Sequence, residues 1–143
     1  MGRTGPGLSS DMFEITVQAE FAAAHSLVIA GAREPIHGHN WHVTVTVSGA
    51  TLDTDGLLCD FHTVEDVLRG TIAPFHNANL NDTAPFDRLN PSAEHVAKYI
   101  AEALSEGLNE ALSPHAAITS VRVTEAPGCA ATYRVPNKST PEN

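Results

Sequence analysis

The sequence predicts an α+β fold in which an antiparallel sheet carries two helices on one face. Two pairs of segments alternate between apolar and polar residues, one pair near the start of the chain and one near its end. The region between the pairs contains two segments with apolar residues at helical spacing. The resulting order, strand–strand–helix–helix–strand–strand, joins two antiparallel hairpins through a pair of helices.

The strands of this plan follow from alternation with a period of two residues. In residues 12–20 and 40–48 the apolar residues mostly occupy every second position, which is typical of a strand with one buried face. A long loop over residues 26–36 connects these strands, and loops of this length in small domains usually serve a function. The second hairpin joins residues 118–125 to 130–135.

The two helices are bounded by capping residues and prolines. Thr63 can cap the first helix, and Pro74 ends it. Ser92 can cap the second helix, and Pro114 closes it. Its apolar stripe consists of Val96, Ile100, Ala103, Leu104, Leu108 and Leu112. The segment between the helices has no period and is predicted to be a loop.

Length and charge restrict the class of protein. A chain of 143 residues forms one domain, which we expect over residues 12–136, with disordered tails over 1–11 and 137–143. A formal charge of −9 argues against nucleic acid and anionic membranes as partners. No apolar run approaches the roughly 20 residues that span a bilayer, and the first residues lack the apolar segment of a secretory signal. Two cysteines make no disulfide framework, which predicts a cytoplasmic location.

Three histidines have the spacing of metal ligands. His37 and His39 stand two residues apart at the start of an alternating run, so their side chains point to the same face of an extended chain. His25 ends the preceding alternating run, and a hairpin would bring it beside them. Three neutral imidazoles with one open position describe a catalytic zinc site. The alternative is that the His-Gly-His segment is a plain loop and His25 a surface histidine.

The predicted sheet also has open edges. Four strands covered by helices on one face leave two unpaired edge strands, and such edges invite pairing with another copy of the chain. We therefore expect a homo-oligomer in which several subunits contribute strands to one barrel.

Six short motifs occur in an order that resembles the 6-pyruvoyl-tetrahydropterin synthase and 6-carboxytetrahydropterin synthase family. The resemblance runs from about Phe13 to Val135, and the motifs are specific as a set. They are Phe21 to His25, His37 to Asn40, Asp60-Phe61, Leu80-Asn81-Asp82, Asn90 to Glu94, and Val123-Thr124-Glu125. The resemblance implies the tunnelling fold, whose trimers close a barrel and stack in pairs as hexamers.

The resemblance also implies roles for individual residues. His25, His37 and His39 match the three zinc ligands of the family. Glu125 matches the carboxylate that anchors the pterin ring, since a carboxylate can accept two parallel hydrogen bonds from the 2-amino and N3 positions. Ser92 and Glu94 match positions that line the pterin pocket from a neighbouring subunit. Without the resemblance, Glu125 would be an exposed strand residue, and Ser92 and Glu94 part of a helix cap.

The sequence departs from the family at its catalytic groups. No cysteine lies between His25 and His37, and the positions of the family's Asp-His pair hold His76 and Asn77. An asparagine amide cannot shuttle protons near neutral pH, so the standard synthase reaction is not predicted. Glu34 offers a replacement base, and this resembles a subgroup that cleaves the pterin side chain. His76 is a candidate second acid or base. The alternatives are a solvated loop carboxylate and a surface histidine.

Three functions remain open at this point. The first is a zinc-dependent lyase acting on the side chain of a dihydropterin such as dihydroneopterin or its triphosphate. The second is a catalytically impaired homologue that binds a pterin-like or purine-like ligand. The third, a scaffold without a ligand, leaves the three histidines and Glu125 unexplained.

Overall fold

The computed structural model describes residues 11–137, so most of each predicted tail lies outside the described residues. The two long strands of the first hairpin are β1 (Phe13–His25) and β4 (His37–Gly49), and the second hairpin is β6 (Ala116–Ala126) and β7 (Cys129–Arg134). The helices are α1 (Phe61–Ile72), α2 (Ala93–Gly107) and the short α3 (Asn109–Leu112). The minor elements are β2 (Val28–Ile29), β3 (Ala32–Arg33), β5 (Ala78–Asn79) and the 3-10 turns η1 (Ala73–Phe75) and η2 (Leu80–Asp82).

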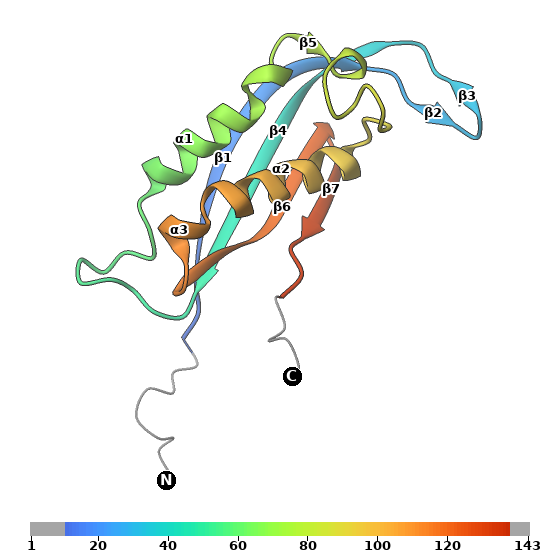
Figure 1. Cartoon of the computed structure of the whole chain (residues 1–143). Coiled ribbons are helices and arrows are strands. Elements are labelled where there is room, and N and C mark those ends of the chain that lie inside the picture. The colour runs from blue at the N-terminus through green and yellow to red at the C-terminus, as the bar shows by residue number, and fades with distance from the viewer. Residues whose placement is uncertain (1–10, 138–143) are drawn as a thin grey trace.

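The predicted fold class is confirmed. The main sheet has the order β5-β1-β4-β6-β7, and β1, β4, β6 and β7 pair antiparallel. Figure 1 shows α1 and α2 packed on the same face of this sheet. The four-strand plan lacked β5, which pairs parallel with β1, and it lacked the small sheet formed by β2 and β3. No helix in the described part of the chain has the length and apolarity needed to cross a bilayer.

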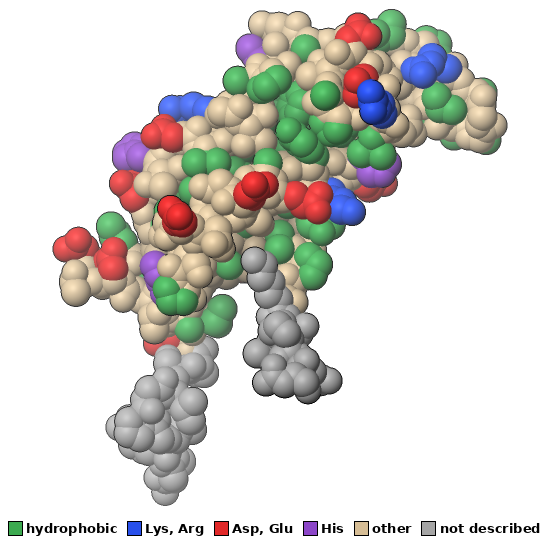
Figure 2. Space-filling view, in the orientation of Figure 1, with side chains coloured by type: hydrophobic (Ala, Val, Ile, Leu, Met, Phe, Trp, Pro, Cys, Tyr) green, Lys and Arg blue, Asp and Glu red, His purple; other side chains and the backbone are tan. Residues whose placement is uncertain are grey.

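The core lies between the helices and the inner face of the sheet. Val43, Val45 and Val47 of β4 are completely buried and face the helices. From the other side, α1 contributes Val64 and Leu68, which are also completely buried. The helix surface in Figure 2 carries scattered acidic and few basic side chains, as the negative charge predicts.

Each of the two long helices differs from its prediction at one end. α1 is capped by Asp60, whose carboxylate accepts a hydrogen bond of 2.9 Å from the backbone N–H of His62, so the prediction of Thr63 as the cap is wrong. A carboxylate at this position also lies favourably against the positive end of the helix. α2 begins at the predicted cap Ser92 but stops at Gly107, and Pro114 follows only after α3. Glycine weakens a helix, and a Cβ on Gly107 would lie 3.0 Å from Cγ1 of Val67.

The predicted loop over residues 26–36 contains an ordered hairpin. β2 and β3 pair antiparallel across a two-residue turn at Ala30 and Gly31, which both have positive φ angles, of 52° and 82°. Positive φ at both central residues is the requirement of a type I′ hairpin turn. Figure 1 shows this hairpin projecting beyond the end of the main sheet.

Candidate metal centre

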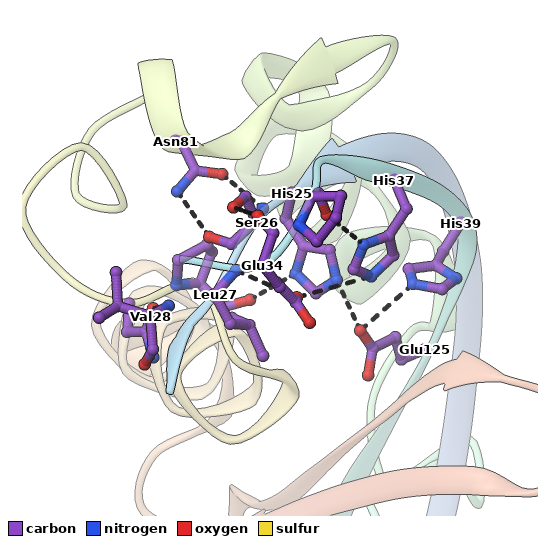
Figure 3. A network of polar contacts seen from close by, with 12 residues as sticks. His25, Ser26, Leu27, Val28, Glu34, His37, His39, Asn81 and Glu125 are labelled. Carbon is purple, nitrogen blue, oxygen red and sulfur yellow. Dashed lines mark hydrogen bonds and ion pairs between the residues drawn. The ribbon is translucent and has the colours of Figure 1, made fainter. Parts of the chain in front are cut away.

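The candidate site lies at the end of the β1–β4 ladder from which the β2–β3 hairpin projects. The register pairs His25 with His37 and Ala23 with His39, so all three imidazoles stand on the same face of the sheet. Glu125 joins them from β6 (Figure 3). The nearest donor atoms of these four side chains all lie within 4.8 Å of one another. The structure therefore brings the three predicted histidines and the predicted carboxylate together.

Backbone carbonyl groups fix two of the three imidazole rings. Nδ1 of His25 lies 2.8 Å from the carbonyl oxygen of Pro91, and Nδ1 of His37 lies 3.0 Å from that of Pro35. A carbonyl oxygen only accepts, so Nδ1 carries a proton in both rings, and in the neutral form of each ring Nε2 is the nitrogen with the free lone pair. Metal-binding histidines in proteins are held in this way by their second nitrogen.

The Nε2 atoms of His25 and His39 are buried and make no hydrogen bond. One oxygen of Glu125, Oε1, nevertheless lies 2.6 Å from the first and 3.4 Å from the second. A lone pair and a carboxylate oxygen this close to each other require a positive charge between them, either a proton on the ring or a metal ion. Three imidazoles and a carboxylate are ligands that Zn²⁺ prefers, so the donor set fits the predicted metal.

His39 is suited to bind a metal in its neutral form. Burial lowers the pKa of His39, and the carboxylate of Glu125 opposes this effect only in part. The neighbouring His25 and His37 lower the pKa further. Metal ions bind the deprotonated imidazole, so the surroundings favour the form that coordinates.

Glu34 lies beside the histidines at the end of the β2–β3 hairpin. Its Oε1 is 3.8 Å from Nε2 of His37 and accepts a hydrogen bond of 3.1 Å from the backbone N–H of Leu27. The hydroxyl of Ser26 donates to the carbonyl oxygen of Glu34 at 2.5 Å. The carboxylate is therefore held near the cluster, although it is not one of the four grouped side chains.

Two asparagines attach the hairpin to the rest of the protein. Asn81 accepts from the backbone N–H of Ser26 at 2.8 Å and donates to its carbonyl oxygen at 2.9 Å. Asn90 makes the same pair of bonds with Val28, at 2.9 and 3.1 Å. Each side-chain amide thus makes the two hydrogen bonds with one residue that the backbone of a neighbouring strand would make. The sequence motifs contained both asparagines, but their pairing with the hairpin had no sequence signal because it joins segments more than 50 positions apart.

The other predicted site residues lie outside the four-residue cluster. Nδ1 of His76 accepts a long hydrogen bond of 3.3 Å from the backbone N–H of Ala22. Ser92 caps α2 by accepting from the backbone N–H of His95 at 3.1 Å, and Glu94 is exposed in the first turn of that helix. Within one chain, these three side chains do not reach the histidines in the contacts that the described residues make.

A shallow groove borders the cluster. It encloses about 550 Å³ and is lined by residues 22–24, 38–40 and 77–79. His39 belongs to this lining and Glu125 does not. Asn77 lies in the lining with a φ of 58°, and its N–H donates to the carbonyl oxygen of Ala22 at 2.6 Å. The groove is large enough for a small heteroaromatic ligand.

The fold and the site together define an α+β protein in which three histidines and one carboxylate, a group that could hold a metal ion, lie together at the end of a mostly antiparallel sheet. Residues 14–136 match the family described as 6-pyruvoyl tetrahydropterin synthase, and the chain belongs to that family. The predicted resemblance is thereby confirmed.

Two sequence relatives are tetrahydropterin synthases by name. The chain is 35% identical over 94 residues to the 6-carboxy-5,6,7,8-tetrahydropterin synthase of Bacillus subtilis, covering 62% of each protein. It is 31% identical over 68 residues to the "Putative 6-carboxy-5,6,7,8-tetrahydropterin synthase" of Archaeoglobus fulgidus, covering 48% of this chain and 58% of that one. The alignments thus span about three fifths of each relative's length.

Solved structures share the fold over nearly the whole chain. The Caenorhabditis elegans 6-pyruvoyl tetrahydropterin synthase superposes with a TM-score of 0.74 at 21% identity, covering 88% of this chain and 97% of that one. A Plasmodium vivax synthase in which a catalytic glutamate is replaced by alanine gives a TM-score of 0.71 at 20% identity, covering 87% and 98%. These neighbours confirm the tunnelling fold.

Proposed function

We propose that this protein is a zinc-dependent enzyme of lyase type that acts on the side chain of a dihydropterin such as dihydroneopterin or its triphosphate. The observation that carries the proposal is the convergence of His25, His37 and His39 with two carboxylates, Glu34 and Glu125, at one end of the sheet. Membership of the family and the names of the relatives support a pterin as the ligand.

The three histidines would hold zinc through their Nε2 atoms. Bound zinc supplies a Lewis acid for an oxygen of the pterin side chain. The carbonyl oxygens of Pro91 and Pro35 keep two of the rings oriented toward the ion. A hydrogen bond to the second ring nitrogen sets the orientation of a metal-binding histidine and raises its basicity.

Glu34 is the proposed base. Its Oε1 is held by the N–H of Leu27, which leaves Oε2 to accept a proton from a hydroxyl of the pterin side chain. The position beside His37 keeps this carboxylate close to the proposed metal. A glutamate is also named as a catalytic residue in the Plasmodium vivax synthase, which supports a carboxylate in this role within the fold.

The remaining residues have proposed roles in binding and proton transfer. Glu125 accepts hydrogen bonds from the 2-amino and N3 positions of the pterin ring. Ser92 and Glu94 line the pterin pocket of a neighbouring subunit, a role compatible with the helix cap that Ser92 makes. His76 is the second acid or base, acting through Nε2 because Nδ1 accepts from Ala22.

A homo-oligomer, and specifically a hexamer, is part of the proposal. In the described part of the chain β7 pairs only with β6, which leaves one edge of the main sheet open for a strand of another copy. Light scattering on the purified protein tests it, and a monomer at micromolar concentration would contradict it.

The activity is tested with the zinc-loaded full-length protein and with both dihydroneopterin and its triphosphate. We expect turnover to a product with a shortened or eliminated side chain, resolved by chromatography with fluorescence detection. Replacing the base, Glu34→Gln, is expected to lower kcat by about 10²–10⁴-fold. Glu102→Gln on the exposed side of α2 is the matched control. No product from either substrate would overturn the proposal.

A second candidate is a catalytically impaired homologue that binds a pterin-like or purine-like ligand. It is favoured by Asn77, which occupies the position of a catalytic histidine in the resemblance and cannot move protons. Tight pterin binding without turnover, lost in Glu125→Ala, would support this candidate over the enzyme.

A further inference from the structure

We infer that the carboxylate of Glu125 alternates between two partners: it is the fourth ligand of the metal when no pterin is bound, and it leaves the metal when the ring of a pterin binds. The inference rests on the proposed function, because it assigns to one side chain both the metal and the ring. It adds a resting state in which a side chain of the protein occupies the fourth ligand position of the metal.

The position of the carboxylate supports the first of these states. Oε1 of Glu125 lies 2.6 Å from Nε2 of His25 and 3.4 Å from Nε2 of His39. A tetrahedral zinc ion with bonds of about 2.0–2.1 Å separates its ligand atoms by about 3.3 Å. The contact with His39 already has this separation, and the contact with His25 would lengthen as an ion entered between the atoms.

The surroundings of the histidines point to the same conclusion. Nδ1 of His25 is already bonded to the carbonyl oxygen of Pro91, so Nε2 is the only ring nitrogen left for a metal. The Nε2 atoms of His25 and His39 are buried without a hydrogen bond, and the nearest charged oxygen to each belongs to Glu125. A cation at this point satisfies all three atoms together.

The backbone at Glu125 explains why its side chain reaches the histidines. The β6–β7 register shifts between Thr124 and Ala126, and the β4–β6 ladder ends at Thr124. Glu125 follows the buried Val121 and Val123 on the same face of β6, and it has no strand partner at this irregularity of the ladder. The side chain is 25% exposed, and within residues 11–137 its polar contacts are with His25 and His39. Leaving the metal would break no other bond.

One carboxylate cannot complete both interactions at full strength. An anchor for a pterin ring needs both oxygens directed at the 2-amino and N3 groups. The groove beside the cluster includes His39 in its lining but not Glu125, so a ring bound there has to draw the carboxylate away from the histidines. Binding of the ring thereby opens the fourth position of the metal only when a substrate is present.

This exchange makes a thermodynamic prediction. A pterin that has the ring but no side-chain oxygen removes Glu125 from the metal and supplies no ligand to replace it. Such a ligand and the metal should therefore weaken each other's binding by the same factor, because coupling between two sites is reciprocal. A pterin with a hydroxylated side chain should show weaker antagonism.

The experiment uses the full-length protein with Co²⁺, whose visible spectrum reports the number of ligands, and with 6-methylpterin as the ring without a hydroxyl. Metal affinity is measured by chelator competition for the wild type, Glu125→Gln, Glu125→Ala and the control Glu102→Gln. We expect affinity to fall by about tenfold or more in both Glu125 variants and not in the control. We also expect 6-methylpterin to lower the affinity of the wild type alone and to change its Co²⁺ spectrum. Circular dichroism of the metal-free variants checks that they fold.

Two results would overturn the inference. Equal Co²⁺ affinity in the wild type and both Glu125 variants, with pterin binding lost in the variants, would make Glu125 an anchor only and leave the proposed function intact. A wild-type spectrum unchanged by 6-methylpterin at saturation would show that the carboxylate does not leave the metal. Absence of pterin binding in the wild type, by contrast, would count against the proposed function itself.

Discussion

The same alternation of inward and outward side chains runs along the whole β1–β4 ladder, but it places apolar side chains inward at one end and histidines at the other. Toward Gly49 the inward positions of β4 hold Val43, Val45 and Val47, which are buried under the helices. Toward the other end the same face holds His37 and His39. The candidate metal centre thus continues the alternating pattern of the core, with imidazoles in place of valines. A shift of one residue in register would turn the histidines to the opposite face, so the core fixes the site.

This comparison predicts that substitutions at the core end reduce stability, whereas substitutions at the histidine end reduce metal binding. The largest expected effect is at the boundary between them. Trp41 is fully buried and stacks on Phe21 with ring centroids 5.7 Å apart. Trp41→Ala is expected to lower the free energy of unfolding by about 3–5 kcal/mol, measured by urea denaturation. A loss below 1 kcal/mol would show that the boundary is not part of the core.

At the histidine end, His37→Ala should separate metal binding from stability. The side chain of His37 is 39% exposed, so the metal-free protein should lose little stability. Zinc affinity should fall by more than the roughly 10–100-fold that follows loss of an outer-shell partner. In a thermal-shift titration, zinc at 100 times its Kd should stabilise the wild type by about 2.7 kcal/mol and the variant far less. Equal zinc-dependent stabilisation would remove His37 from the ligand set.

The third prediction concerns the connection of the hairpin to the sheet. Asn81→Ala removes two hydrogen bonds to Ser26 and is expected to cost about 1–3 kcal/mol. It should also lower kcat, because Ser26 holds the backbone of Glu34. Asn81→Asp keeps the acceptor for the N–H of Ser26 and should recover part of both losses. A drop in stability with kcat unchanged would limit Asn81 to a structural role.

The smallest expected effect is at the helix cap, away from the ladder. Ser92→Ala should reduce the free energy of unfolding by about 1 kcal/mol, because the N–H of His95 loses its acceptor. Ser92→Thr should preserve most of the stability, and chemical denaturation of both variants measures the difference. Unchanged stability in the alanine variant would contradict a contribution of the cap.

Sequence periodicity predicted the part of the structure that depends on neighbouring residues. The alternation around His37 and His39 predicted that they share a face, and the order of strands predicted that His25 would join them. The hairpin turn at Ala30 and Gly31 was missed because alanine rarely adopts the positive φ that this turn requires. The cap at Asp60 and the helix end at Gly107 were missed because Thr63 is also a good cap residue and the apolar stripe of the second helix continues beyond Gly107.

The parts of the site that the sequence did not reveal involve backbone atoms and distant segments. The carbonyl oxygens of Pro35 and Pro91 orient two imidazoles, and every residue carries such an oxygen, so no pattern identifies these two. The irregularity of the ladder at Glu125 depends on how β6 and β7 pair, which alternation within one strand does not specify. The convergence of the three histidines and Glu125 was therefore predictable from the sequence, whereas the orientation of their side chains was not.

The hydrogen bond between His25 and Pro91 connects two residues that are 66 positions apart in the chain. Pro91 directly precedes the cap of α2, so an ion that immobilises His25 also restrains the entry to that helix. Loading with metal should consequently slow hydrogen–deuterium exchange of amides in the first turn of α2 while leaving α1 unaffected. Hydrogen–deuterium exchange in the first turn of α2 would then show whether the ion is bound, although this turn lies outside the site.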